Sequence, residues 1–176
     1  MTDLNIKNLS YIDNFKHSVL GNFVNFRTRA SRSEYWRFTA VTVVIGFVFT
    51  LLRFIFGNTF LGSLINLLSF AYTCVMFLPS LGIAVRRLHD INKSGWFWLI
   101  IFVPIIGLVY VIYLLAKPGD VGDNQYGSPT SYETITAEEA ARTGLKETPS
   151  ESMDQKAMLA CICLTVLNIW MSFLGL

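Results

Sequence analysis

The sequence has little charge and little histidine for its length. Only 15% of its 176 residues are charged, whereas a soluble domain usually carries about 25%. A metal-dependent hydrolase needs several converging ligands, but the only histidines are His17 and His89. His89 and Asp90, as neighbours on a helix, would diverge by about 100°. Because no set of nucleophile, base and orienting group is readable, we expect no enzyme, no metal and no cofactor.

Cysteine is also scarce, and its placement excludes a redox or metal role. The chain has three cysteines, Cys74, Cys161 and Cys163, and all lie inside apolar runs. Cys161 and Cys163 are two residues apart, so on a helix they point to different sides. The pattern therefore indicates small buried apolar residues.

What the sequence does have is long apolar runs. It is 53% hydrophobic, with a mean hydropathy of +0.48. A helix needs about 20 apolar residues to cross about 30 Å of hydrocarbon. The sequence predicts an all-α, polytopic transmembrane helical bundle with four spans, at residues 37–56, 60–85, 96–116 and 157–176. Pro104 and Gly107 are residues that can break the third span near its middle, and the sequence leaves open whether they do.

Four segments follow from these runs. Residues 1–36 form a cytoplasmic interfacial segment, and residues 37–127 form a membrane domain with three spans. Residues 128–156 are an acidic polar linker, and residues 157–176 are an additional C-terminal transmembrane helix.

The distribution of lysine and arginine predicts an orientation. Both the N-terminal segment and the loop after the second span are rich in these residues, which favour the cytoplasmic side. Residues 117–156 carry eight acidic residues against four basic ones, so this segment is expected outside. A fourth span then returns the C-terminus to the cytoplasm. Aromatic residues at the ends of the runs, Tyr35, Trp36, Trp96 and Trp98 among them, are expected at the membrane interface.

Two polar clusters flank the spans on the predicted inner face. FRTRASRSEYW (26–36) precedes the first span, and VRRLHDINKSGWFW (85–98) separates the second from the third. If the second helix continues to Asp90, Arg86 and Asp90 are four residues apart and can pair. Asn92 to Gly95 is typical of a turn. The topology predicts that the two clusters are neighbours in space.

These clusters, with KPGDVGDNQYG (117–127), resemble domain-of-unknown-function family 805, the YhaH-like bacterial inner-membrane proteins. The resemblance covers roughly residues 10 to 127. The matching positions are Arg29, Arg32, Glu34, Tyr35, Trp36, Arg86, Arg87, Leu88, His89, Asp90, Ser94, Gly95, Trp96, Asn124, Tyr126 and Gly127. Thr28 stands where the family pattern has glycine. The resemblance implies a small integral protein of the bacterial inner membrane, and it implies no activity.

Three hypotheses for the arginine motifs remain open. The first is that they only enforce topology, as the positive-inside rule requires. The second is an anion site for a lipid headgroup or a phosphorylated ligand, because arginine binds phosphate bidentately; its residues are Arg29, Arg32, Arg86, Arg87 and His89. The third is a small oligomeric transporter or channel. We expect a non-enzymatic role in binding, sensing or organising. The expected partners are the lipid bilayer, anionic lipid headgroups, and a second copy of the chain or another membrane protein, but no nucleic acid.

Overall fold

The computed structural model describes residues 11–104, 106–128 and 158–165. Its elements in chain order are α1 (Tyr11–Lys16), the π-helical turn η2 (His17–Gly21), α2 (Arg32–Phe56), α3 (Phe60–Asp90), the 3-10 helix η3 (Gly95–Phe102) and α4 (Ile106–Ala116). Residues 158–165 are also helical. The described ranges contain no strand, only an isolated β-bridge between Asn124 and Gly127. The all-α class is confirmed for this part of the chain.

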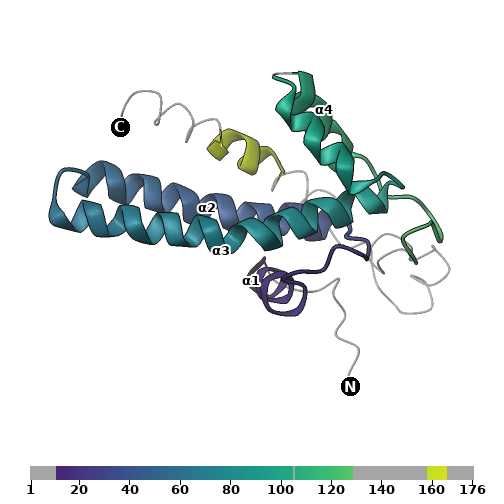
Figure 1. Cartoon of the computed structure of the whole chain (residues 1–176), viewed down its shortest axis with the longest axis horizontal. Coiled ribbons are helices and arrows are strands. Elements are labelled where there is room, and N and C mark those ends of the chain that lie inside the picture. Colours follow the sequence, from purple (N-terminus) through teal and green to yellow (C-terminus); the bar gives the residue numbers. More distant parts are fainter. Residues whose placement is uncertain (1–10, 105, 129–157, 166–176) are drawn as a thin grey trace.

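The helices α2 and α3 form a long antiparallel hairpin, in which they lie side by side (Figure 1). Each begins at a hydroxyl cap. Ser31 Oγ accepts a hydrogen bond from Glu34 N at 3.2 Å, and Thr59 Oγ accepts one from Gly62 N at 3.1 Å. With 25 and 31 residues, the helices are about 37 Å and 46 Å long at 1.5 Å per residue. Both exceed the thickness of the hydrocarbon core.

The surfaces of α2 and α3 are unlike those of helices in a soluble core. Both helices are long and apolar enough to cross a membrane, yet only 6% of the most apolar stretch of α2 and 28% of that of α3 is buried. These two helices correspond to the first two predicted spans. The structure extends both of them, since α2 starts at Arg32 rather than Arg37 and α3 ends at Asp90 rather than Val85.

The third predicted span, 96–116, is not one helix. The 3-10 helix η3 ends at Phe102, Val103 is extended, and α4 starts only at Ile106. Pro104 lies at the break, and a proline disfavours helical backbone in the residue before it.

The two pieces of this segment fold back on each other as a second hairpin, here called the short hairpin (95–116). Gly107 makes the close approach possible, because a Cβ there would lie 1.8 Å from the carbonyl oxygen of Ile100. The sequence left open whether Pro104 and Gly107 break this segment; the structure shows the break, and the expectation of one continuous span is wrong.

A small apolar core joins the two hairpins. Its buried residues come from α2, α3 and the residue that follows it, α4 and the helix at 158–165: Trp36, Leu88, Ile91, Val111, Leu114, Leu115 and Cys161. Cys161 is buried, as predicted, whereas Cys74 and Cys163 are exposed. The rest of the fourth predicted span (166–176) and nearly all of the predicted linker (129–156) lie outside the described residues.

Candidate functional site at the charged end

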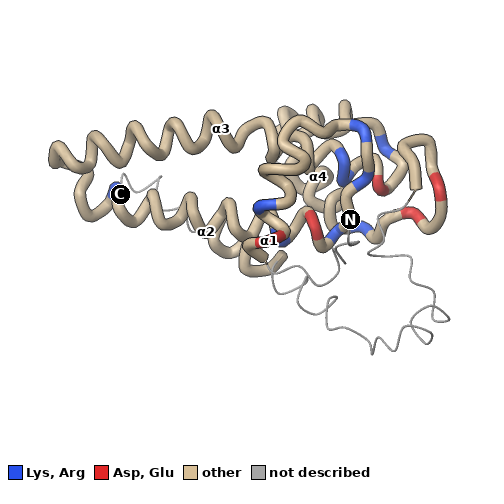
Figure 2. Tube along the Cα trace, turned by 90° about the horizontal axis from the view of Figure 1, so that it is seen from below, with Lys and Arg blue, Asp and Glu red and all other residues tan. Residues whose placement is uncertain are grey.

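Charged residues gather at one end of the α2–α3 hairpin, where the chain enters α2 and leaves α3 and α4 (Figure 2). We call this region the charged end; it comprises residues 27–37, 86–93 and 117–123. Most of the length of α2 and α3 away from it carries no charge. The hairpin of α2 and α3 is therefore apolar along most of its length and charged at one end.

Asp90 is the centre of the charged end. Its Oδ1 accepts a hydrogen bond from Arg29 Nε at 2.9 Å, and its Oδ2 accepts one from Arg87 Nη1. All three side chains are at most 2% exposed. One carboxylate thus joins two buried guanidinium groups, of which that of Arg29 lies 61 residues from Asp90 in the sequence and that of Arg87 only three. Buried charges are stable only when they are paired and hydrogen-bonded.

The remaining donors of Arg29 bind the loop that follows α4. Its Nη2 donates to the carbonyl of Asp120 at 2.6 Å, and its Nη1 donates to that of Gly122 at 2.7 Å. Asp120 N in turn donates to the carbonyl of Asp90 at 2.8 Å. These bonds hold residues 120–122 against the end of α3.

Arg87 binds the end of α4 in the same way. Its Nε donates to the carbonyl of Leu115 at 3.1 Å, and its Nη2 donates to that of Lys117. Leu115 lies in the last turn of α4, where carbonyls lack an intrahelical partner, and Lys117 directly follows the helix. Arg87 is therefore a C-terminal cap for α4 supplied by another helix.

Arg86 makes a separate buried ion pair. Its Nη2 donates to Glu34 Oε1 at 2.7 Å, and its backbone carbonyl accepts from Ala30 N at 3.0 Å. Asn14 Nδ2 donates to the carbonyl of Glu34 at 3.1 Å, which ties α1 to the start of α2. The suggested pairing of Arg86 with Asp90 is wrong, because the start of α2 offers Arg86 a nearer carboxylate. The prediction that the two arginine motifs are neighbours is confirmed.

His89, also in the last turn of α3, makes contacts of a different kind from those of the arginines. Its ring stacks on Tyr126, with 3.7 Å between the ring centroids and 2° between the planes. Asn124 Nδ2 donates to the backbone carbonyl of His89 at 2.9 Å. The Asn92 turn also forms as predicted: Asn92 has a φ of +54°, and Lys93 N donates to the carbonyl of Leu88.

The other positions of the predicted site have varied surroundings. Arg32 is the first residue of α2 and is half-buried. Ser94 caps η3, and a Cβ on Gly95 would lie 2.8 Å from the Val85 side chain. Trp36 is buried in the core, whereas Trp96 is 78% exposed. Within the described residues, His89 lines a cavity whose wall includes none of the four arginines.

The placement of residues 117–127 corrects the predicted topology. Both ends of the short hairpin meet α3 at the charged end: Gly95 at Val85, and Leu115 and Lys117 at Arg87. The loop after α4 is therefore on the same side as the 86–95 loop. The expectation that 96–116 carries the chain to the other face is wrong, because Pro104 turns the chain back.

Comparison with known proteins identifies the relatives. A family model described as "Protein of unknown function (DUF805)" matches residues 23–128. The chain belongs to this family. It is 38% identical over 115 residues to inner membrane protein YhaI of Escherichia coli (strain K12), which covers 65% of this chain and 93% of YhaI. It is 36% identical over 115 residues to inner membrane protein YhaH of the same strain, covering 65% and 94%. No solved structure matches.

The DUF805 match contains the buried ion pairs of Arg29, Glu34, Arg86, Arg87 and Asp90 and ends before the helix at 158–165. The segments 26–36, 85–98 and 117–127 all lie within this match, and they meet at the charged end. The sequence did not predict that the backbone carbonyls of Asp120, Gly122 and Lys117 accept hydrogen bonds from buried arginines. The glycine-rich KPGDVGDNQYG predicted a turn, but a sequence pattern does not reveal which carbonyls a distant arginine reaches.

Proposed function

We propose that this chain is a non-enzymatic protein of the bacterial inner membrane, in which α2 and α3 cross the bilayer and the charged end lies in the cytoplasm. The relatives are named inner membrane proteins. The exposed basic residues Arg27, Lys93 and Lys117 gather at the charged end, which the positive-inside rule assigns to the cytoplasm. The link between α2 and α3, Gly57–Asn58–Thr59, has no charge and lies at the other end.

In this topology the short hairpin enters the cytoplasmic leaflet and returns. Its arms have 8 and 11 residues. At about 2.0 Å per residue for a 3-10 helix and 1.5 Å for an α-helix, each reaches about 16 Å, half of the hydrocarbon core. Large apolar side chains at its tip, Phe102 and Ile106, are exposed. Figure 1 shows α4 leaving the charged end at an angle to α2 and α3.

This arrangement reverses the predicted position of the C-terminus. Residues 117–127 are then cytoplasmic, and the helix at 158–165 packs against the core of the charged end through Cys161 and Met158. A span that begins there ends in the periplasm. We therefore propose a cytoplasmic N-terminus and, if 157–176 crosses the membrane, a periplasmic C-terminus.

The function that we propose is binding of anionic lipid headgroups at the cytoplasmic leaflet. Arg29, Arg86 and Arg87 are buried and donate to groups of the protein. The proposed site therefore consists of the exposed cations Lys93 and Lys117. The observation that carries it is the position of two ammonium groups over rings of the short hairpin. Lys93 Nζ lies 5.6 Å from the ring centroid of Phe97, and Lys117 Nζ lies 5.6 Å from that of Tyr113. These cations would lie at headgroup depth when the hairpin enters the leaflet.

Cysteine labelling tests the topology. In a background with Cys74, Cys161 and Cys163 replaced by alanine, Lys93→Cys and Gln125→Cys should both be shielded from an impermeant thiol reagent in intact cells. Asn58→Cys should be labelled, and all three should react after permeabilisation. Labelling of Gln125→Cys together with shielding of Lys93→Cys would mean that residues 95–116 cross the membrane.

Lipid-dependent stability tests the binding role. Purified protein in nanodiscs should melt at a higher temperature with phosphatidylglycerol than with phosphatidylcholine, because each basic residue near an anionic surface contributes about 1 kcal/mol. Lys93→Gln with Lys117→Gln should remove most of this difference. Arg53→Gln, near the far end of α2, is the matched control and should leave it intact. An equal effect of the control would refute binding at the charged end.

A further inference from the structure

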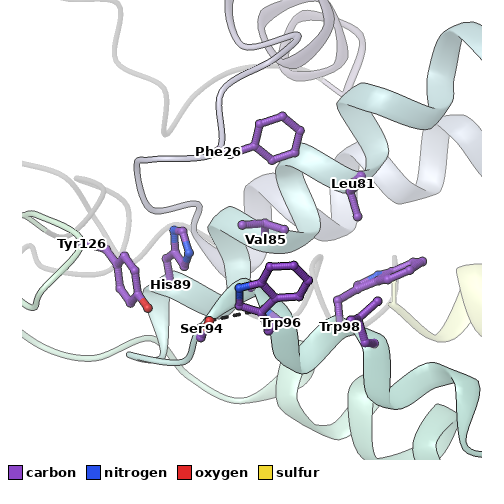
Figure 3. Close-up of a pocket in the computed structure, with 10 residues that line it drawn as sticks. Phe26, Leu81, Val85, His89, Ser94, Trp96, Trp98 and Tyr126 are labelled. Atoms are coloured by element: carbon purple, nitrogen blue, oxygen red, sulfur yellow. Dashed lines mark hydrogen bonds between the residues drawn. The ribbon is translucent and has the colours of Figure 1, made fainter.

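Two cavities follow one another along α3, on the side where η3 lies. The first has a volume of about 380 Å³, and its wall includes α3 residues between Leu81 and His89 (Figure 3). The second has a volume of about 290 Å³, and its wall includes α3 residues between Phe77 and Ala84. Leu81 and Trp98 belong to both walls. We call the two cavities together the groove.

The length of the groove matches one leaflet of a bilayer. From His89 to Phe77 it follows about 18 Å of α3, at 1.5 Å per residue. Half of a hydrocarbon core of about 30 Å is about 15 Å. In the proposed topology the His89 end lies at the charged end, and the Phe77 end lies toward the middle of the bilayer. The groove is therefore about as long as an acyl chain of the cytoplasmic leaflet.

The wall is polar at one end and mostly apolar along the rest. His89, Ser94 and Tyr126 form the polar end, and Figure 3 shows Leu81 and Trp98 away from His89 and Tyr126. The remaining residues of the first wall are apolar: Phe26, Val85, Gly95, Trp96 and Leu99.

The second wall has hydroxyl groups, but two of them are already bonded within α2. Thr39 Oγ1 donates to the carbonyl of Tyr35, and Thr42 Oγ1 donates to that of Thr39, both at 2.8 Å. Phe77 is 58% exposed and Leu99 46% exposed, so the groove reaches the surface that the proposed topology turns toward lipid.

A hollow on a lipid-facing surface favours a lipid chain as its occupant. An empty hollow loses the van der Waals contacts of its lining atoms, and water needs polar partners that a mostly apolar wall does not provide. A chain of the surrounding leaflet is as apolar as leucine, so it fills the groove without loss of hydration. What distinguishes one lipid from another is then its headgroup.

The surroundings of the polar end favour an anionic headgroup. Two exposed cations adjoin the wall, because Arg27 directly follows Phe26 and Lys93 directly precedes Ser94. The exposed acids of the 120–123 loop come before Tyr126 in the chain, so a phosphate is expected at the Phe26 and Ser94 part of the polar end. Cations beside an interfacial pocket bind phosphate headgroups in this way.

We propose that the groove binds one acyl chain of an anionic phospholipid, whose phosphate interacts with Arg27 and Lys93 and whose chain ends near Phe77. The proposal rests on the proposed function, since Lys93 is one of the two cations of that site. It adds a defined place for the chain. The protein then holds a single lipid molecule as a ligand, beyond a general attraction of anionic lipid to its surface.

Photo-crosslinking of the full-length protein in phosphatidylcholine nanodiscs tests the proposal. The probe is phosphatidylglycerol with a diazirine at the end of one acyl chain, and mass spectrometry locates the adduct. Adducts are expected on the second wall, within 77–84 and 38–42, and they should saturate as the probe content rises. Unlabelled phosphatidylglycerol should compete. Phosphatidylcholine, as the bulk lipid, should not prevent labelling, and glycerophosphoglycerol, the same headgroup without chains, should not compete.

Two variants test the place of the chain. Leu81→Trp puts a larger side chain where the two cavities meet, and overpacking of about 1 kcal/mol or more should reduce labelling at a subsaturating probe content at least about fivefold. Leu78→Trp is the matched control, because Leu78 is an exposed residue of α3 outside both walls. It should label like wild type.

A charge variant tests the place of the phosphate with Leu81 intact, which keeps the test valid if Leu81→Trp does not fold. Each basic residue near an anionic headgroup contributes about 1 kcal/mol, or about fivefold. Arg27→Gln with Lys93→Gln should therefore raise the probe content needed for half-maximal labelling by at least about tenfold. Arg53→Gln, near the far end of α2, is the control and should leave it unchanged.

Three results would each overturn the proposal: equal labelling of Leu81→Trp and Leu78→Trp, no effect of the charge variant, or adducts that rise with probe content without saturation. If phosphatidylglycerol raises the melting temperature through Lys93 and Lys117 but the groove adducts do not saturate, headgroup binding stands and this proposal fails. If the adducts saturate and depend on Leu81, Arg27 and Lys93, while Lys93→Gln with Lys117→Gln keeps the full melting effect, the groove stands and the proposed headgroup site fails.

Discussion

Arg29 and Asp90 form a fully buried ion pair, with 2.9 Å between Nε and Oδ1, although 61 residues separate them in the sequence. The pair connects the segment before α2 to the last residue of α3. Through the other donors of Arg29 it also connects both to the loop after α4. One guanidinium group therefore fixes the relative positions of three segments that are remote in the chain.

Neutralising Asp90 should destabilise the protein strongly. Asp90→Asn leaves Arg29 and Arg87 buried without their carboxylate, and breaking a buried pair costs about 3–5 kcal/mol. The free energy of unfolding in detergent, measured by denaturant titration, should fall by this amount. Asp123→Asn removes an exposed acid of the same type and should change it by less than about 0.5 kcal/mol. Similar losses for both variants would mean that the network contributes little.

The Arg86–Glu34 pair should behave as a coupled unit. Glu34→Leu alone leaves the guanidinium of Arg86 buried and unpaired, whereas Glu34→Leu with Arg86→Met replaces both charges by apolar groups. Such double replacements of buried pairs are often close to neutral. We expect the double variant to be more stable than Glu34→Leu by at least about 1 kcal/mol. Additive losses in this double-mutant cycle would contradict a direct interaction between the two side chains.

Lysine should not replace the buried arginines. Arg87 donates from Nε, Nη1 and Nη2 to three different acceptors, and the single ammonium of a lysine does not reach three fixed positions. Arg86→Lys with Arg87→Lys should therefore lower the melting temperature even in nanodiscs without anionic lipid. Arg27→Lys, at an exposed position, should not. A loss that appears only when anionic lipid is present would instead favour an anion site at Arg86 and Arg87.

The short hairpin should require glycine at position 107. Gly107→Ala places a methyl group where the carbonyl oxygen of Ile100 lies 1.8 Å away, so the two arms must separate. Limited proteolysis of the purified protein should then cut within 95–116 faster than in wild type. Gly46→Ala, with nothing within 4 Å of the added methyl, is the control and should be cut like wild type. Equal cleavage of both variants would argue against the close packing of η3 and α4.

The sequence by itself determined the class of the protein and its membrane character. Apolar runs of about 20 residues admit few alternatives, because the thickness of a bilayer sets the length of a spanning helix. The clustering of basic residues also predicted that the arginine motifs share one face. Local rules were sufficient for the Asn92 turn, which depends on the backbone preferences of single residues, and they marked Pro104 as a position where the helix can break without deciding that it does.

The tertiary structure decided which partner each charge has and which way the chain runs after Pro104. A local rule suggested Arg86 with Asp90, but folding brought Glu34 to Arg86, and Arg29 and Arg87 to Asp90. A break in a helix is visible in sequence, whereas the direction of the next segment depends on contacts with distant groups. Here the contacts of Arg87 with the carbonyls of Leu115 and Lys117 return α4 to the charged end. Such long-range hydrogen bonds leave no periodic or compositional signal in the sequence, and they are the reason that a predicted span is a short hairpin.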